Sequence, residues 1–392
     1  MTEDIKAAAE ALEDETVALR RDFHQHPELA FEEVRTSSII AERLAALGLS
    51  VRSGVGKTGV VGILDSGKPG RTVLVRADID ALPVFEERDT PYRSLVDGKM
   101  HACGHDGHAA VALSTAKLLS ERKDAFSGKV VFVLQPAEEI VRGAEAMLKD
   151  GGLDNIKPDA SIGLHLSSNA PTGSVAVRAG PMMAATDSFR LLVRGRGGHA
   201  AQPHLTVDPV VIAAQLVLAL QGLVSRETDP AKQAVVSVTS VHGGTAYNII
   251  PNEVELKGTL RTFDPELREA LRARILEVAE GVANLQRGSV ETTWNVGSPA
   301  VVNDEAMTER LKRVAASVLG EDGVQESERI MGGDDMALWL QEAPGCYFFV
   351  GARDEAAGID KPHHHPQFDI DERALPLAVE LLSRGALDFL EG

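Results

Sequence analysis

The densest group of side chains that could bind a metal ion lies in the segment MHACGHDGH, residues 100–108. Cys103 and His105 flank a glycine there, at the expected start of a helix. A soft thiolate two residues from an imidazole could form half of a transition-metal site. The alternative is an ordinary helix entry with a buried cysteine and a surface histidine, so a metal site requires further ligands elsewhere in the chain.

Two adjacent carboxylates follow an apolar strand segment in QPAEE, residues 135–139. Open α/β sheets bind ligands at the carboxyl ends of their strands, which is where these acids are expected. One glutamate could bind a metal ion while its neighbour transfers protons, as metal-assisted hydrolysis requires. The alternative is an acidic first turn of the next helix, stabilised by the helix dipole.

Further imidazoles come from two other segments. ASIGLH ends in His165 at the same predicted sheet edge, and KPHHHPQFDID contains His363, His364 and His365, one of which could complete a site. A cysteine, a glutamate and three histidines are more ligands than one four-coordinate ion needs once water is counted. We therefore expect two metal ions close together.

Another pair of acids, Asp78 and Asp80, follows a strand in RADIDALP, residues 76–83. In an extended segment their side chains point the same way. One of them could orient a ligating histidine, or could help to fix a metal ion through hydrogen bonds to its ligands. A simple Asx turn before Pro83 is the alternative.

Three more residues are candidates for substrate contacts. His199 lies in the glycine-rich turn GRGGHAAQPH, where glycines allow a substrate to approach the backbone closely. Asn248 lies in YNIIPNE, and Arg261 lies in the strand segment GTLRTF. An arginine within a strand could bind a substrate carboxylate or form a structural salt bridge.

The elements that must position these residues alternate between strand and helix at both ends of the chain, which is typical of an α/β sheet covered on both faces. Hydrophobic periodicity predicts helices over residues 2–22, 33–47, 106–122, 303–318 and 372–390 and near 139–150. Short β-branched runs predict strands over residues 58–64, 71–77, 129–135, 160–165 and 346–352.

A different order, β-α-β-β-α-β, occupies the middle of the chain and is typical of a ferredoxin-like domain. Its predicted strands are 188–195, 234–242, 254–263 and 290–296, and its predicted helices are 206–223 and 265–286. We therefore expect a catalytic domain formed by residues 1–181 and 296–392, with an inserted domain at 182–295. The chemistry is expected where the insert faces the main domain.

Composition restricts the function classes. The chain has 392 residues with a net charge of −18, 44% hydrophobic and 25% charged residues, which excludes disordered and fibrous classes and suggests two or three domains. Such acidity disfavours nucleic acid and anionic membrane surfaces as partners. With only two cysteines, no apolar leader and no membrane-length apolar run, we expect a cytoplasmic protein.

Taken in order, the motifs resemble the dinuclear metallopeptidase family that includes aminoacylases, hippurate hydrolases and auxin-conjugate amidohydrolases. The resemblance runs from about residue 20 to residue 385, and MHACGHDGH together with QPAEE is its most specific part. Other matching segments are HQHPELAFEE, RADIDALP, GLH, GPMMAATD, GRGGHAAQPH, YNIIPNE, GTLRTF and HHPQFDID. The resemblance implies a metal-binding α/β catalytic domain with an inserted lid or dimerisation domain. It also implies a homodimer, with a homotetramer as the alternative.

Position by position, the resemblance implies a role for each site residue. Glu138 resembles the general base, and Asp80 resembles the carboxylate that supports a ligand. A histidine ligand stands in the wider family where Asp78 is found here, so this chain resembles the branch that uses the Cys103/His105 loop. The family's last histidine ligand stands two residues before a proline, here Pro366. The implied metal ligands are Cys103, His105, Glu139, His165 and His364, with His365 as the fallback for the last.

In the insert, His199 resembles the histidine that reaches a partner subunit's site and helps to hold the oxyanion. Asn248 and Arg261 resemble contacts to the substrate carboxylate. One segment departs from the family: MGGDDMALW stands where many relatives have glycine-serine-Glu-Asp-Phe. Asp334 is therefore one methylene shorter and Met336 replaces an aromatic residue, which weakens any transfer of acyl-group preference.

The expected reaction is hydrolysis of an N-acyl amino acid, such as an N-acetyl or N-benzoyl amino acid, to a carboxylate and a free amino acid. It would use water activated by two divalent ions, zinc or manganese, with cobalt or nickel as alternatives. A metallo-dipeptidase or carboxypeptidase is the nearest competing function. A cysteine hydrolase with Cys103 as nucleophile and a non-catalytic metal-binding protein are the others, and the intact QPAEE pair argues against the last.

Overall fold

The structure of the protein is a computed structural model that describes residues 2–391. Contacts divide the chain into two compact units. Unit 1 comprises Met1–Met182, Val301–Glu328 and Asp334–Gly392, and unit 2 comprises Met183–Ala300 and Arg329–Gly333. Unit 1 is thus built from three chain segments.

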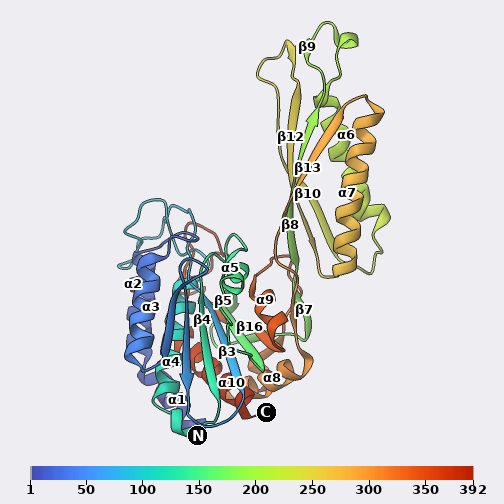
Figure 1. Ribbon diagram of the computed structural model, residues 1–392. Helices are drawn as coiled ribbons and strands as arrows, with labels where there is room; N and C mark the ends of the chain where they lie inside the picture. Colours follow the sequence, from blue (N-terminus) through green and yellow to red (C-terminus); the bar gives the residue numbers. More distant parts are fainter. Residues whose placement is uncertain (1, 392) are drawn as a thin grey trace. The chain divides into compact units, whose positions relative to one another are not determined.

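Unit 1 is organised around an eight-stranded mixed sheet (Figure 1). The four neighbouring strands β4, β3, β5 and β16 are parallel, and β1, β2 and β6 run antiparallel to a neighbour. In spatial order the strands are β1 (Ser50–Val55), β2 (Gly59–Asp65), β4 (Lys129–Gln135), β3 (Thr72–Asp78), β5 (Ala160–Pro171), β16 (Gly345–Arg353), β6 (Val175–Val177) and β15 (Val324–Glu326). Outside this sheet, β7 (Gly180–Met183) pairs with β14 (Val301–Asn303).

Helices cover both faces of this sheet. Along β4, Val130, Phe132 and Leu134 belong to the main apolar core, while the side chains that alternate with them point to the opposite face. Most helices pack on the core side, and the short helices α5 and α9 contact strands from the other side. The helices of unit 1 are α1 (Thr2–Ala11), α2 (Glu13–Gln25), α3 (Val34–Ala46), α4 (His105–Ser120), α5 (Gly143–Lys149), α8 (Glu305–Leu319), α9 (Met336–Glu342) and α10 (Ala374–Glu391), with 3₁₀ turns at Lys123–Ala125 and Glu321–Gly323.

Unit 2 is a four-stranded antiparallel sheet in the order β10-β12-β8-β13, with α6 and α7 packed against it (Figure 1). Its element order, βαββαβ, agrees with the ferredoxin-like pattern predicted for the insert. The elements are β8 (Ala185–Arg194), α6 (Pro209–Gly222), β10 (Ala234–His242), β12 (Glu253–Thr262), α7 (Pro265–Leu285) and β13 (Ser289–Val296), a separate pair β9 (Gly198–His199) and β11 (Ile249–Ile250), and turns of helix at Pro203–Leu205 and Leu223–Glu227.

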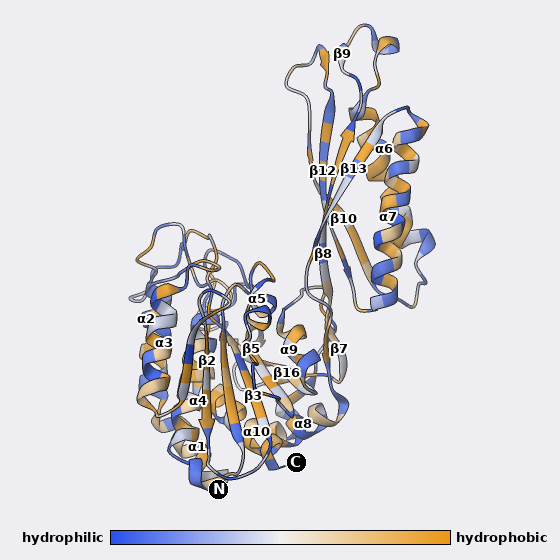
Figure 2. Cartoon of the chain, viewed as in Figure 1, coloured by the Kyte–Doolittle hydropathy of each residue, from blue (hydrophilic) through white to orange (hydrophobic). Residues whose placement is uncertain are grey.

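One helix of unit 2 is unusually apolar. Figure 2 shows hydrophobic residues along most of α6, as they are along the strands of the large sheet. Among the described residues, only the stretch Pro209–Glu227 is long and apolar enough to cross a membrane. Length and composition alone are weak evidence, because a core helix meets the same criteria, and Ile212, Leu216 and Leu220 of α6 are buried in the core of unit 2.

Several predicted boundaries were wrong. The helix predicted over 2–22 is two helices that break at Leu12, where no glycine or proline marks the break. The helix predicted near 139–150 begins only at Gly143, and the strand predicted over 160–165 continues to Pro171. The strands β1, β6, β7, β14 and β15 and the helix α9 were not predicted, because they are short or partly polar.

Candidate metal centre and active site

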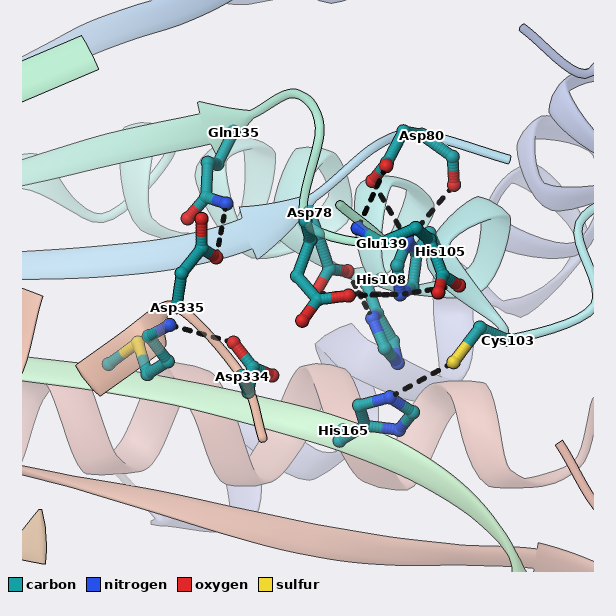
Figure 3. A network of polar contacts seen from close by, with 12 residues as sticks. Asp78, Asp80, Cys103, His105, His108, Gln135, Glu139, His165, Asp334 and Asp335 are labelled. Carbon is teal, nitrogen blue, oxygen red and sulfur yellow. Dashed lines mark hydrogen bonds and ion pairs between the residues drawn. The ribbon is translucent and has the colours of Figure 1, made fainter. Parts of the chain in front are cut away.

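The candidate residues of unit 1 meet at the carboxyl ends of the parallel strands. Asp78 ends β3, and the acids of QPAEE follow β4. His165 lies within β5 beside them, and the neighbouring loop supplies Cys103 and His105 (Figure 3). This is the sheet edge at which α/β proteins bind ligands.

The entry to α4 depends on one glycine. Gly104 has φ +91°, a left-handed conformation that glycine adopts without strain, and α4 begins at the next residue. The nearest atoms that an added Cβ would meet lie 3.8 Å away, so backbone conformation rather than space requires glycine here. This turn carries Cys103 on one side and His105 on the other.

The loop that carries the two glutamates is held by buried carboxylates. Glu33 Oε1 accepts a hydrogen bond from the Ala137 backbone N–H (2.9 Å), and Asp80 Oδ2 accepts one from the Glu139 N–H (3.0 Å). Ala137 and Val141 both have positive φ, and α5 begins only at Gly143. The two glutamates therefore lie ahead of the helix, and an acidic first helical turn is excluded.

Possible ligand atoms from four chain segments converge. Cys103 Sγ lies 3.6 Å from His165 Nε2, and Glu139 Oε2 lies 3.3 Å from His364 Nε2. The other Glu139 oxygen lies 3.9 Å from His105 Nε2. The possible ligand atoms form overlapping sets, each within 4.8 Å: Cys103, Glu139 and His364; His105, Glu138 and Glu139; Cys103, His165 and His363; and His105, His108 and His165.

Three side-chain atoms of these residues are buried without a hydrogen-bond partner among the described residues: His105 Nε2, Glu139 Oε1 and His363 Nδ1. His105 Nδ1 donates to the Asp80 carbonyl (2.9 Å) and to Asp80 Oδ1 (3.2 Å), which leaves the Nε2 lone pair free. Buried polar atoms normally have partners. A lone pair oriented by a carboxylate behind it is the arrangement of a metal-binding histidine, so these residues fit a cation.

His108 and Asp78 have other partners. His108 Nδ1 donates to one Asp78 oxygen, and His108 Nε2 accepts a hydrogen bond from the Leu166 N–H (2.9 Å). The second Asp78 oxygen accepts from Arg76 Nη1 (2.6 Å). Both residues are therefore satisfied by the protein. The spacing of MHACGHDGH does not separate such a structural histidine from a ligand, and His108 carried no signal in the sequence.

The three consecutive histidines differ in their surroundings. The His364 N–H donates to the Ala102 carbonyl (2.7 Å), which places its ring beside Glu139. His363 Nε2 accepts a hydrogen bond from the Ser168 N–H (3.3 Å), so its lone pair is used. His365 Nδ1 accepts one from the Gln367 N–H (3.0 Å) within its own loop, and His365 belongs to none of the ligand sets.

Burial shifts the pKa values of the convergent carboxyl and thiol groups away from their ligand forms, whereas it lowers the pKa of His165 and of His364 and so favours the neutral imidazole that binds a metal. Burial, reinforced by the neighbouring carboxylates, raises the pKa of Glu138 well above its usual value, and burial raises the pKa of Glu139 to about 7. Burial also raises the pKa of the Cys103 thiol. A cation among them would favour the deprotonated forms, so metal binding here is coupled to proton release.

Behind Glu138 lies a second group of buried acids. The carboxylates of Glu138, Asp334 and Asp335 lie within 4.8 Å of one another. Asp334 accepts hydrogen bonds from Tyr347 Oη (2.6 Å) and Arg76 Nη2 (3.0 Å). Asp334, noted in the sequence only as a departure from the family, thus lies next to the predicted general base. Arg76 was missed, although an arginine inside the apolar strand RTVLVRA is an available signal.

The three predicted substrate contacts lie in unit 2, and one chain does not bring them together. His199 pairs with Ile249 in the β9–β11 ribbon, and the Ala200 N–H donates to the Asn248 carbonyl (3.1 Å). His199 and Asn248 are therefore neighbours, and both are exposed. Arg261 is near the other end of β12, about 25 Å away by strand rise alone. Its Nε donates to Thr259 Oγ1 (3.0 Å), and its guanidinium has no carboxylate in hydrogen-bond contact among the described residues.

Several known proteins are similar to this chain in sequence and in fold. The chain is 39% identical over 381 residues to thermostable carboxypeptidase 1 of Saccharolobus solfataricus, covering 96% of each chain. It is 38% identical to N-acetylcysteine deacetylase of Bacillus subtilis, covering 98% and 99%. The crystal structure of the Bacillus subtilis YXEP protein, described as a dinuclear metal-binding peptidase, matches with a TM-score of 0.83 and 35% identity over 97% of this chain and 99% of that one.

These likenesses cover both units of the chain, including the whole of the ligand cluster. The sequence pattern of one family, described as peptidase family M20/M25/M40, matches residues 74–388. This match confirms the family resemblance noted in the sequence, and the mixed α/β fold agrees with it. The chain therefore belongs to peptidase family M20/M25/M40 and is a hydrolase of that family.

Proposed function

We propose that this protein is a metal-dependent amidohydrolase that cleaves N-acyl amino acids to a carboxylate and a free amino acid. The observation that carries the proposal is the different surroundings of two adjacent buried glutamates. Glu139 faces Cys103 and His364, whereas Glu138 lies beside Asp334 and Asp335. These surroundings support Glu139 as a ligand and Glu138 as the base.

Two divalent ions would be held by Cys103, His105, Glu139, His165 and His364. Glu139 has one oxygen near His364 and the other near His105, so both of its carboxylate oxygens would be available as ligand atoms. When bound, such ions activate a water molecule and polarise the acyl carbonyl. The mixed sulfur, nitrogen and oxygen donors suit zinc or manganese, with cobalt or nickel as alternatives.

Glu138 would act as the general base. Its carboxylate would take a proton from the attacking water and return it to the leaving amine, so no covalent intermediate is required. Asp80 would hold His105 in the tautomer whose Nε2 lone pair faces the site, as its two hydrogen bonds to Nδ1 indicate. Burial raises the pKa of Cys103, which makes this thiol a poor nucleophile and disfavours a cysteine hydrolase.

Unit 2 would act as a lid and dimerisation domain in a homodimer, with a homotetramer as the alternative. The α6 helix buries one side in its own unit but leaves Val210, Val211 and Leu218 exposed. We propose that a second copy covers this apolar side. His199 would then stabilise the oxyanion in the partner's site, and Asn248 and Arg261, which are far apart in one chain, would contact the substrate carboxylate from different subunits.

The substrate class is supported by the name of one relative, an N-acetylcysteine deacetylase. Another relative is named a carboxypeptidase, so peptide hydrolysis is the second candidate. Neither function requires nucleic acid or a membrane. We propose the cytoplasm as the location, because the two buried cysteines, Cys103 and Cys346, form no disulfide.

The test is amino-acid release from N-acetyl, N-benzoyl and indole-acyl amino acids and from dipeptides, with metal-loaded and chelator-stripped protein. We expect metal-dependent release from at least one acyl amino acid, at a higher kcat/KM than from any dipeptide. Release from dipeptides alone would establish the second candidate. Release that persists in stripped protein would contradict the metal mechanism.

A further inference from the structure

Arg20 on α2 is a charged residue with no exposed surface. Each nitrogen of its guanidinium donates to a different carboxylate: Nε to Asp106 (2.8 Å), Nη2 to Asp369 (2.7 Å) and Nη1 to Glu372 (3.2 Å). The next residue, Arg21, has a side chain that is 45% exposed. Among the described residues its only carboxylate partner is Glu372, and its guanidinium also lies over the Tyr92 ring. The sequence did not indicate this difference, because both arginines lie in the polar helix EDETVALRRDFHQ.

The partners of Arg20 belong to the segments that carry the proposed ligands. Asp106 directly follows His105 in the first turn of α4. Asp369 follows the three consecutive histidines in the same loop, five positions after His364. No atom of Arg20 is in hydrogen-bond contact with a proposed ligand among the described residues. Any effect of Arg20 on the ligands therefore passes through the backbone of these two segments.

A third segment, between Asp80 and Cys103, joins the same group. The Arg20 guanidinium lies over the Tyr92 ring, 4.8 Å from its centroid, and Tyr92 Oη donates to the second Asp369 oxygen (2.8 Å). His24, one turn after Arg20, donates from Nδ1 to Asp106 (2.7 Å). Segments far apart in the chain are thus fixed to one side of α2.

The charges in this group depend on one another. Asp106 and Asp369 are both buried, and a buried carboxylate without a counter-charge is strongly destabilising. Asp369 also lies 3.0 Å from Arg88 Nε, whereas Arg20 is the only guanidinium paired with Asp106 among the described residues. A lysine could not replace the arginine fully. Its compact ammonium group lacks the planar, fixed arrangement of donors with which the guanidinium reaches three separate carboxylates.

We propose that Arg20 is a positioning residue of the metal centre, which joins the Cys103–His105 segment to the His364 loop and so sets the separation of their ligands. This inference rests on the metal site proposed above. It assigns a function to a buried ion network that the hydrolytic mechanism itself does not use.

The test compares R20K with R268K. Arg268 in unit 2, whose side chain is 12% exposed, donates to both oxygens of the buried Asp187 (2.8 and 2.7 Å) and belongs to none of the ligand-bearing segments. The measurements are the Co²⁺ affinity by chelator competition, the visible absorption spectrum of the Co²⁺-loaded protein and the melting temperature of the metal-free protein. Affinity and spectrum report ligand geometry, whereas melting reports the fold.

We expect both variants to melt at lower temperature, but only R20K to bind Co²⁺ about 10- to 100-fold more weakly, with a changed spectrum, as when residues that support metal ligands are replaced. Wild-type affinity and spectrum in R20K, or an equal loss of affinity in R268K, would overturn the inference. Failure of the wild-type protein itself to bind Co²⁺ would instead refute the proposed function.

If R20K does not fold, D369N provides the same test. Asparagine keeps the shape and one acceptor oxygen of Asp369, while Arg20 keeps its contact with Asp106. We expect weaker Co²⁺ binding than in the wild type. Unchanged Co²⁺ affinity in folded D369N would equally overturn the inference.

Discussion

Glu138 and Glu139 are adjacent in sequence and both side chains are buried. Each has an oxygen near His105 Nε2, at 3.8 and 3.9 Å, but their other neighbours differ. The Glu139 oxygens lie near His364 and His105, and its N–H is bound by Asp80. The Glu138 carboxylate lies within 4.8 Å of Asp334 and Asp335. Replacing either glutamate by its amide removes one charge with almost no change of volume, which separates ligand from base.

We predict that E138Q retains both metal ions but loses most turnover, by about 10²- to 10⁴-fold in kcat, because an amide cannot accept the proton. E139Q is the matched neighbour and should lose metal, because it removes a ligand charge. Metal content by elemental analysis and kcat at saturating substrate check both. Loss of metal in E138Q, or unchanged turnover, would contradict the assignment of Glu138.

Residue types and spacing indicated the ligand candidates. They did not show which of several similar side chains have a ring nitrogen that no protein hydrogen bond occupies. Among the three consecutive histidines, only the family resemblance, through the spacing from Pro366, favoured His364. The structure shows that His363 and His365 accept backbone hydrogen bonds and His364 does not. Likewise, His108 differs from His105 only in its partners. Such distinctions depend on contacts between distant segments, which spacing does not contain.

At the scale of elements, the apolar strands and the order of the ferredoxin-like unit were predictable, because a strand buried in a sheet has a recognisable run or alternation of apolar residues in its sequence. Their ends were less so: α5 starts at Gly143 rather than near residue 139, since Ala137 and Val141 adopt left-handed conformations that their residue types do not indicate. This displaced start is what leaves both glutamates on a loop. Gly104 is the opposite case, a glycine whose conformation its residue type favours.

We predict that G104A lowers the free energy of unfolding of the metal-free protein by about 1–2 kcal/mol, the cost of a left-handed non-glycine residue. G281A is the control, because Gly281 is inside α7 with open space around it. It should stabilise the protein by about 0.5–1 kcal/mol. Urea unfolding measures both, and equal effects of the two substitutions would contradict the backbone argument.

At the scale of the whole molecule, the exposed side of α6 is the feature that one chain leaves unexplained. Leu218 is 73% exposed on a helix whose other side is fully packed. Apolar side chains gathered on one helix are characteristic of a protein interface. The wide separation of Asn248 and Arg261 along unit 2 agrees with a site that needs two chains.

We predict that the wild-type protein is a homodimer and that L218E is largely monomeric, because a buried carboxylate without a partner opposes association. L95E is the control: Leu95 in unit 1 is similarly exposed, at 69%, and its substitution should leave the dimer intact. Light scattering coupled to size-exclusion chromatography gives the masses. A monomeric wild type, or a dimeric L218E, would refute this interface.

Because unit 1 is divided into three chain segments, its proposed ligands and its strands are synthesised in two stages, before and after unit 2. Cys103, His105, Glu139 and His165 leave the ribosome before the whole of unit 2, whereas His364 and β16, the neighbour of β5, emerge after it. A nascent chain that stops within unit 2 therefore has a partial ligand set and one unpaired edge on β5, a form prone to aggregation. The complete ligand set can form only when the last tenth of the chain has been translated.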